Sequence, residues 1–262
     1  MTRATVTFVA DTPEGAHARS RIPAGPGSGC AVMAHRGASR DERENTLAAF
    51  RRAAEVGSDA VELDVRRTRD GVLVVHHDPR VGDGRVIIET TRVELPALVP
   101  TLAAALDACR GMWVNVEIKN DPTEADFDPT DEIAAVVAAE LLSRNEPQRF
   151  LVSSFRRETI DRFRQFAPGI ATAWLTPGVA PDDAHNVLAS LGDAGHSAIH
   201  PWFGLVSADL VRVAHEHGLM VNVWTCDDPE KMKELAGFGV DGICTNVPDV
   251  AIAALVSLRG SR

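Results

Sequence analysis

The 262-residue sequence has few cysteines and no motif that pairs them. The four lie far apart and form no Cys-x-x-Cys pair, so neither a disulfide framework nor a structural zinc site is predicted. We expect these residues to be reduced and mostly buried: Cys30, Cys109, Cys226 and Cys244.

Long apolar runs are missing as well. No stretch approaches the roughly 20 apolar residues that a membrane-spanning helix needs. The N-terminal segment has only a short apolar run, without the basic start and longer apolar core of a secretory signal. We therefore expect a soluble, cytoplasmic protein without stable membrane insertion.

Positive charge is scarce too, because 27 Lys and Arg stand against 37 Asp and Glu, which gives a net charge of −10. Such a chain repels nucleic acid and anionic membrane surfaces, so no nucleic-acid partner is expected. The sequence also has no dinucleotide fingerprint, P-loop or Gly-x-Ser-x-Gly elbow. It gives no indication of the oligomeric state.

Residues 1–30 show no helical periodicity and end in a segment rich in Pro and Gly, so they are predicted to be an N-terminal extension or linker. From residue 31 to 262 we expect one domain, in which short β-branched runs alternate with Ala- and Leu-rich helical segments. That alternation indicates βα units around a parallel sheet.

Eight such units are predicted, which favours a closed (β/α)8 TIM barrel over an open sheet. The strands are expected near 31–34, 59–65, 113–118, 150–153, 170–174, 197–200, 219–224 and 240–244. The helices are expected near 46–56, 101–109, 131–143, 158–166, 182–191, 207–217, 229–237 and 248–258. An extra strand near 72–75 should form a hairpin around Asp70-Gly71. Asn45 and Ser207 are predicted helix caps.

The second predicted strand alternates apolar and acidic residues, so Glu62 and Asp64 project to the same side. Two buried carboxylates are costly unless a cation neutralises them, and oxygen ligands at this spacing suit Mg²⁺ or Ca²⁺. On the third strand, Glu117 could complete the ligand set while Lys119 neutralises a substrate oxygen. The alternative for these pairs is a salt-bridged strand end.

Two histidines are candidates for proton transfer near neutral pH. His35 follows the first strand and precedes Arg36-Gly37, where glycine permits close approach and the arginine can contact phosphate. His76 and His77 are adjacent in an extended segment, so only one of them can face a pocket.

The order of these motifs resembles the glycerophosphodiester phosphodiesterase family, over roughly residues 31 to 258. The matching segments are His35-Arg36-Gly37, Glu44-Asn45-Thr46, Glu62-Leu63-Asp64, His77-Asp78, and residues 116–119, 221–225 and 240–249. Two residues depart from the family pattern, since Arg43 stands where proline is usual and Asn246 stands where aspartate is usual.

The resemblance implies a role for each candidate residue. Glu62, Asp64 and Glu117 would be the metal ligands, with Lys119 and Arg36 as phosphate contacts. The family's His-Asp pair selects His77 over His76 as the partner of His35 in catalysis. Trp224 would pack against glycerol. Glu44 would lie beside the metal or hold Arg36, and the alternative is a simple acidic charge in the first turn of a helix.

The implied function is metal-dependent hydrolysis of a small glycerophosphodiester to sn-glycerol 3-phosphate and an alcohol, with histidine acid–base catalysis. One alternative is a lysophospholipase D-type enzyme, which needs an apolar groove beyond the phosphate. Another is a non-catalytic phosphodiester-binding barrel, although such a protein has no need of both histidines. A sugar-phosphate aldolase or isomerase rests on fold analogy alone. The short segment 82–100 predicts an exposed site.

Overall fold

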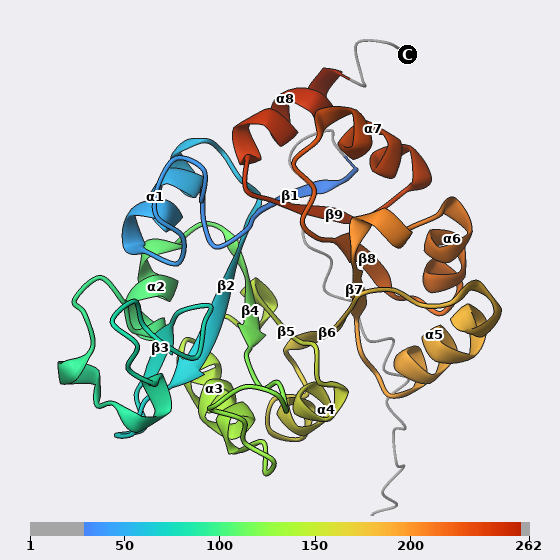
Figure 1. Ribbon diagram of the computed structural model, residues 1–262. Coiled ribbons are helices and arrows are strands. Elements are labelled where there is room, and N and C mark those ends of the chain that lie inside the picture. Colours follow the sequence, from blue (N-terminus) through green and yellow to red (C-terminus); the bar gives the residue numbers. More distant parts are fainter. Residues whose placement is uncertain (1–28, 258–262) are drawn as a thin grey trace, which may run out of the picture.

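The computed structural model describes residues 29–257, so the predicted extension lies outside the described residues apart from its last two. Within this range eight parallel strands form a barrel with helices around it (Figure 1). The strand order is β1-β9-β8-β7-β6-β5-β4-β2, and pairing of β1 with β2 closes the ring. The predicted TIM barrel is confirmed.

The element boundaries follow the sequence pattern closely. The strands are β1 (Ala31–Ala34), β2 (Ala60–Arg67), β3 (Leu73–Val75), β4 (Trp113–Ile118), β5 (Phe150–Ser154), β6 (Ala171–Thr176), β7 (Ala198–Pro201), β8 (Met220–Val223) and β9 (Gly242–Thr245). The α-helices are α1 (Leu47–Glu55), α2 (Leu102–Ala108), α3 (Glu132–Ser143), α4 (Arg157–Phe166), α5 (Ala184–Asp193), α6 (Ala208–Glu216), α7 (Pro229–Phe238) and α8 (Pro248–Ser257). Short 3-10 helices are η1 (Ile87–Glu89), η2 (Arg92–Glu94), η3 (Pro147–Arg149), η4 (Pro181–Asp183) and η5 (Phe203–Leu205).

The core has two parts. Aliphatic and aromatic side chains of the helices pack on the outward faces of the strands and form the larger clusters. Inside the barrel, smaller apolar clusters lie toward the amino ends of the strands. One of them contains Met33 and Cys244. Nearer the carboxyl ends of the strands the buried side chains are polar, including Glu62, Asn115 and Glu117. One end of the barrel is therefore filled with apolar side chains, and the polar side chains that could take part in a reaction lie at the carboxyl ends of the strands.

The predicted hairpin is present, since β3 pairs antiparallel with β2 around Asp70-Gly71. Beyond β3, the backbone N–H of His76 donates to the Asp64 carbonyl oxygen at 3.0 Å, which extends the antiparallel pairing by one residue toward the middle of β2. The following segment, residues 80–100, packs its own small apolar cluster against β3. His77 is thereby brought to the mouth of the barrel.

One of the two predicted caps is confirmed and the other is wrong. Ser207 caps α6 by accepting from the Leu210 N–H. Asn45 does not cap α1, because Thr46 accepts from the Ala49 N–H instead. Asn45 has a left-handed backbone, and its side-chain amide donates to the buried carboxylate of Asp64 at 2.7 Å, a charge-assisted hydrogen bond.

All four cysteines are free and buried, as predicted. In the part of the chain that the structure describes, the helices are too short or too polar to cross a bilayer.

Gly37 is required by the turn that follows β1. Its φ of +86° is strained for other residues, and an added Cβ would lie 2.6 Å from the backbone carbon and Cβ of Ala49 in α1. The absence of a side chain lets the His35-Arg36 turn pack directly on this helix.

Gly37→Ala should therefore cost about 3 kcal/mol or more of unfolding free energy, from backbone strain together with overpacking. Gly57→Ala is the matched control, because Gly57 has a φ of +85° with nothing within 4 Å of an added Cβ. Its cost should be about 1–2 kcal/mol. Urea denaturation measures both, and equal losses would contradict the steric argument.

Candidate active site

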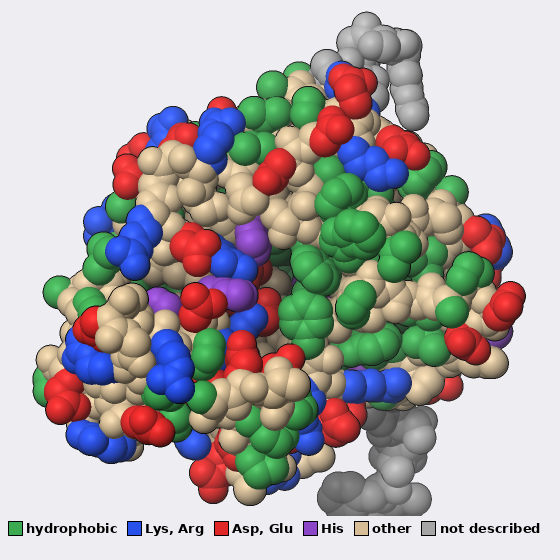
Figure 2. Space-filling view, viewed as in Figure 1, with side chains coloured by type: hydrophobic (Ala, Val, Ile, Leu, Met, Phe, Trp, Pro, Cys, Tyr) green, Lys and Arg blue, Asp and Glu red, His purple; other side chains and the backbone are tan. Residues whose placement is uncertain are grey.

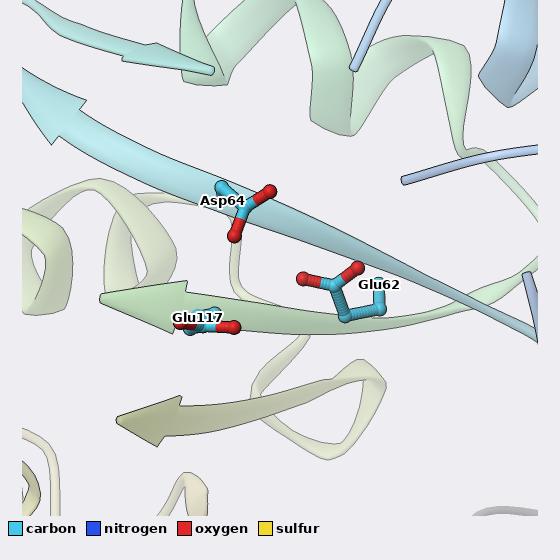
Figure 3. Close-up of side chains that lie close together, drawn as sticks. All are labelled: Glu62, Asp64 and Glu117. Carbon is cyan, nitrogen blue, oxygen red and sulfur yellow. The ribbon is translucent and has the colours of Figure 1, made fainter. Parts of the chain in front are cut away.

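Three carboxylates converge at the mouth of the barrel. Glu62 and Asp64 project from β2 and Glu117 from β4, and Figure 3 shows the three side chains facing one space. The strand register places Asp64 opposite Glu117, which brings the ends of the two strands together. One oxygen from each carboxylate lies within 4.8 Å of the others, and all three residues are buried.

Burial and mutual repulsion destabilise the charged forms of this cluster. Burial, reinforced by Asp64 and Glu117, raises the pKa of Glu62 well above its usual value. Burial also raises the pKa of Glu117, although Lys119 opposes it. Among the described residues, Oε1 of Glu62 is buried without a hydrogen-bond partner. An orphaned carboxylate oxygen within a set of hard oxygen donors fits a divalent cation such as Mg²⁺ or Ca²⁺.

Two cations border the cluster. The Lys119 Nζ lies 2.8 Å from Glu117 Oε1 and 3.7 Å from Asp64 Oδ1, and Arg36 Nε lies 3.2 Å from Asp64 Oδ2. Burial alone would raise the pKa of Asp64, but Lys119 and Arg36 outweigh it and lower that pKa. Arg36 also donates to both oxygens of Glu44 at 3.0 Å. Glu44, 47% exposed, therefore holds Arg36 and lies outside the acidic cluster.

His35 has a fixed orientation. Asn246 donates its amide N–H to Asp227 at 2.7 Å, which turns its amide oxygen toward His35 Nδ1, also at 2.7 Å. Nδ1 of His35 must then carry the proton, so Nε2 is left unprotonated in the neutral ring, 4.0 Å from Glu62. Burial, and next Arg36, lower the pKa of His35. The amide of Asn246 thus orients the His35 ring.

Only one of the adjacent histidines borders the inner cavity of the barrel, although both line a second, outer cavity. His77 borders the cavity that contains the acidic cluster, whereas His76 does not, and the His76 ring contacts the Asp78 carbonyl oxygen at 2.9 Å. His77 Nδ1 lies 2.8 Å from Asp78 Oδ1, which orients its ring. With 33% of its side chain exposed, His77 is open to solvent, and segment 82–100 lies beside it without closing the site.

Two cavities meet at His77. The inner cavity, of about 160 Å³, is lined by Met33, His35, Arg36, Glu62, His77, Asn115, Glu117, Lys119, Phe155, Leu175, His200, Asn222, Trp224, Thr225 and Cys244. The outer cavity, of about 340 Å³, is lined by residues 43–46, 75–77, 81–83, 96, 98 and 99. Figure 2 shows the opening, with histidine, acidic and basic side chains on one flank and hydrophobic side chains on the other.

Sequence reasoning missed several residues of the inner cavity. Asn115 precedes Glu117 by two positions on β4, so the same alternation of faces could have identified it. Asn222 fits because Gly242 has no side chain, since an added Cβ there would lie 2.6 Å from the Asn222 amide oxygen. Asn222 also contacts His200, whose pKa burial lowers to about 3. Phe155 directly follows β5 and belongs to no sequence motif that would have identified it.

Trp224 lies in the wall of the inner cavity. Its ring N–H donates to the His200 carbonyl oxygen at 2.7 Å, and its ring meets Phe155 edge-on with centroids 5.3 Å apart. These contacts hold a flat apolar surface against the polar floor of the cavity.

A sequence model of the glycerophosphoryl diester phosphodiesterase family matches residues 35–250. The chain belongs to this family. A glycerophosphodiester phosphodiesterase from Caldanaerobacter subterraneus is 31% identical over 242 residues, which cover 84% of this chain and 96% of the relative. The family assignment that the sequence motifs suggested is therefore confirmed.

Solved structures of the family share the fold. A structure from Silicibacter pomeroyi, provisionally named a glycerophosphoryl diester phosphodiesterase, superposes with a TM-score of 0.80 at 28% identity, over 90% of this chain and 96% of that one. A phosphodiesterase from Oleispira antarctica, solved with its product sn-glycerol-3-phosphate, gives 0.74 at 25% identity, over 86% and 96%. Together with the family match, these likenesses confirm the predicted enzyme class, a phosphoric diester hydrolase.

The acidic cluster predicts how pH and metal affect this family member. Because folding raises the pKa of Glu62, the folded protein binds a proton that the unfolded chain releases above its pKa of about 4.5. Without metal, stability should therefore fall as pH rises above that value. Glu62→Gln should remove part of this loss when thermal unfolding is followed from pH 5 to 8 in chelator.

Metal should act on the same group. Mg²⁺ or Ca²⁺ at a hundred times its dissociation constant should raise the wild-type melting temperature by about 5–10 °C. The Glu62→Gln variant should lose this response, whereas Glu44→Gln, which alters an exposed carboxylate outside the cluster, should keep it. A metal response that survives Glu62→Gln would contradict the ligand assignment.

Proposed function

We propose that the protein hydrolyses glycerophosphodiesters to sn-glycerol 3-phosphate and an alcohol, with a divalent cation bound by Glu62, Asp64 and Glu117. The observation that carries this proposal is that two buried carboxylates, Glu62 and Glu117, and two histidines line one cavity, with the carboxylate of Asp64 within 4.8 Å of the other two. The names of the relatives and the product bound by the Oleispira antarctica phosphodiesterase support the substrate class.

The charges of the site suit a phosphodiester anion. A cation bound by the three carboxylates would stabilise negative charge that develops on the phosphoryl oxygens. Lys119 and Arg36, both beside Asp64, are placed to bind the same oxygens and orient the phosphate. The apolar surface of Trp224 and Phe155 then receives the carbon skeleton of glycerol.

The two histidines divide the proton transfers. Nε2 of His35 accepts the proton of the attacking water, because the Asn246 contact leaves this nitrogen unprotonated. If the neighbouring glycerol hydroxyl attacks instead, a cyclic phosphodiester forms as the alcohol departs, and water must then open the ring to give glycerol 3-phosphate. As the bond from phosphorus to the alcohol oxygen breaks, His77 donates a proton to that oxygen. This assignment places the departing alcohol toward the outer cavity, which His77 also borders.

A panel of glycerophosphodiesters with glycerol, ethanolamine or choline tests the reaction, with chelator-stripped protein and Mg²⁺ or Ca²⁺ restored. We expect metal-dependent release of glycerol 3-phosphate. His35→Ala should lower kcat by about a hundredfold or more, since a positioned acid or base contributes about 10²–10⁴-fold. His77→Ala should lower kcat similarly with these alcohols but much less with p-nitrophenol as the leaving group, which departs without protonation.

His76→Ala is the matched control, since His76 neighbours His77 but does not line the inner cavity. It should change kcat by less than about threefold. If no diester is hydrolysed with either metal, yet phosphodiesters bind equally well with and without His35, a non-catalytic binding barrel is the better description.

A specific observation favours a second candidate function, lysophospholipase D-type hydrolysis of lysolipids. We define the apolar rim as Phe155, Trp202 and Leu205, which are 38%, 41% and 58% exposed. The backbone of Trp202 pairs with that of Trp224, so this rim continues the apolar wall of the inner cavity out to solvent. Hydrophobic side chains beside the opening are visible in Figure 2. An acyl chain attached to glycerol would lie across them.

If lysolipids are substrates, replacing the rim with polar residues should affect them selectively. A Trp202→Ser, Leu205→Ser variant should raise KM for a lysophosphatidylethanolamine at least about tenfold, because each exposed contact is worth about 1 kcal/mol. KM for glycerophosphoethanolamine should stay within about twofold. Leu142→Ser, which alters an exposed leucine on α3, is the control. Equal effects on both substrates would remove this candidate.

A further inference from the structure

The row of charged residues on β2 continues beyond the two metal-ligand candidates. Side chains at every second position share a face, so Glu62 and Asp64 are followed at the same spacing by Arg66. The Arg66 side chain is 0% exposed and is the largest fully buried side chain among the residues that the structure describes. A charged group of this size is rarely buried completely unless it is paired.

The guanidinium of Arg66 holds the backbone of His77. Its Nε donates to the His77 carbonyl oxygen at 2.9 Å, and its Nη2 donates to the same oxygen. No other donor to this carbonyl occurs within residues 29–257. The guanidinium also forms ion pairs with Asp126, at 2.7 Å from Nη1, and with Glu124, at 2.9 Å from Nη2. Both carboxylates belong to the loop after β4.

His77 needs such a support because the sheet does not provide it. β3 is three residues long and ends at Val75, and the last backbone contact to β2 is made by the His76 N–H. His77 itself lies past that contact, with a third of its side chain exposed. Its ring contact to Asp78 involves a neighbour in the same loop, so it cannot fix the loop against the barrel.

Burying an arginine with two carboxylates gains little stability compared with packing apolar groups, because desolvation offsets most of the attraction. The benefit of the arrangement is therefore geometric. A planar guanidinium with fixed donor directions ties the loop of His77 and the loop of Asp126 to the wall of the barrel.

We propose that Arg66 is a positioning residue that places His77 for proton transfer, by fixing its backbone carbonyl against the end of β2. This inference rests on the proposed function for its kinetic test. Lysine at position 66 keeps the charge but cannot reach the carbonyl and both carboxylates at once, so Arg66→Lys should misplace His77 without removing the buried cation.

A double-mutant cycle tests whether Arg66 acts through His77. With glycerophosphoethanolamine, Arg66→Lys should lower kcat about ten- to a hundredfold, as expected for a misplaced catalytic group, while KM changes less than about threefold. In the His77→Ala background, the same substitution should lower kcat by less than about twofold further. A further tenfold loss in that background would show a general structural defect and overturn the proposal.

Arg149→Lys is the matched control. Arg149 also binds backbone carbonyls, those of Met112, Leu106 and Cys109 at 2.8–3.0 Å, but it lies before β5, at the closed end of the barrel. Its side chain is 12% exposed. Arg149→Lys should lower the melting temperature without changing kcat, and melting curves of all variants establish that they are folded.

A second readout does not need activity. In protein with ¹³C,¹⁵N-labelled histidine, nine ring Cε1–Hε1 resonances are expected, and the His77 resonance is the one that disappears in His77→Ala. Arg66→Lys should shift or broaden it, and Arg149→Lys should leave it in place. If the wild type hydrolyses no diester, the proposed function fails and this measurement alone decides the inference. An unchanged His77 resonance in Arg66→Lys would overturn it.

Discussion

The structure depends on the enclosure of three carboxylates in one small space at the mouth of the barrel. Like charges at this separation repel strongly in a medium of low polarity, so each must find a partner or bind a proton. The surrounding groups follow from this requirement. Lys119, Arg36 and Asn45 all turn toward Asp64, and one oxygen of Glu62 still has no partner. The barrel keeps these groups together because the strand ends that carry them are hydrogen-bonded neighbours.

The same enclosure sets the sign of the field that a substrate meets. When Glu62, Asp64 and Glu117 are all ionised, as they are above the raised pKa of Glu62, their three negative charges outnumber the two positive charges of Arg36 and Lys119 beside them. Such a site repels a phosphodiester. A bound divalent cation would reverse the balance, so the metal requirement in the proposed function has an electrostatic basis that precedes any chemical step.

Much of the fold and part of the site follow from periodicity in the sequence. Alternating faces identified Glu62 and Asp64 as neighbours, and the family resemblance added Glu117 to them. Repeated βα segments identified the barrel with boundaries close to those observed. Contacts that depend on the path of a loop could not be predicted this way. The cap at Asn45 was wrong because its side chain meets Asp64, which is close in space and distant in sequence. The contact of Arg66 with His77 likewise depends on the path that the chain takes when it leaves β2 after His76.

His77 forms part of the wall that the two cavities share, and this position has a consequence for the order of product release. In the proposed reaction, a neutral or weakly bound alcohol departs on the outer side of this residue, directly toward solvent. The phosphate product stays on the inner side, against Lys119 and Arg36. The two products therefore leave by separate routes, with the anion last, and accumulated glycerol 3-phosphate should compete with new substrate for the inner cavity.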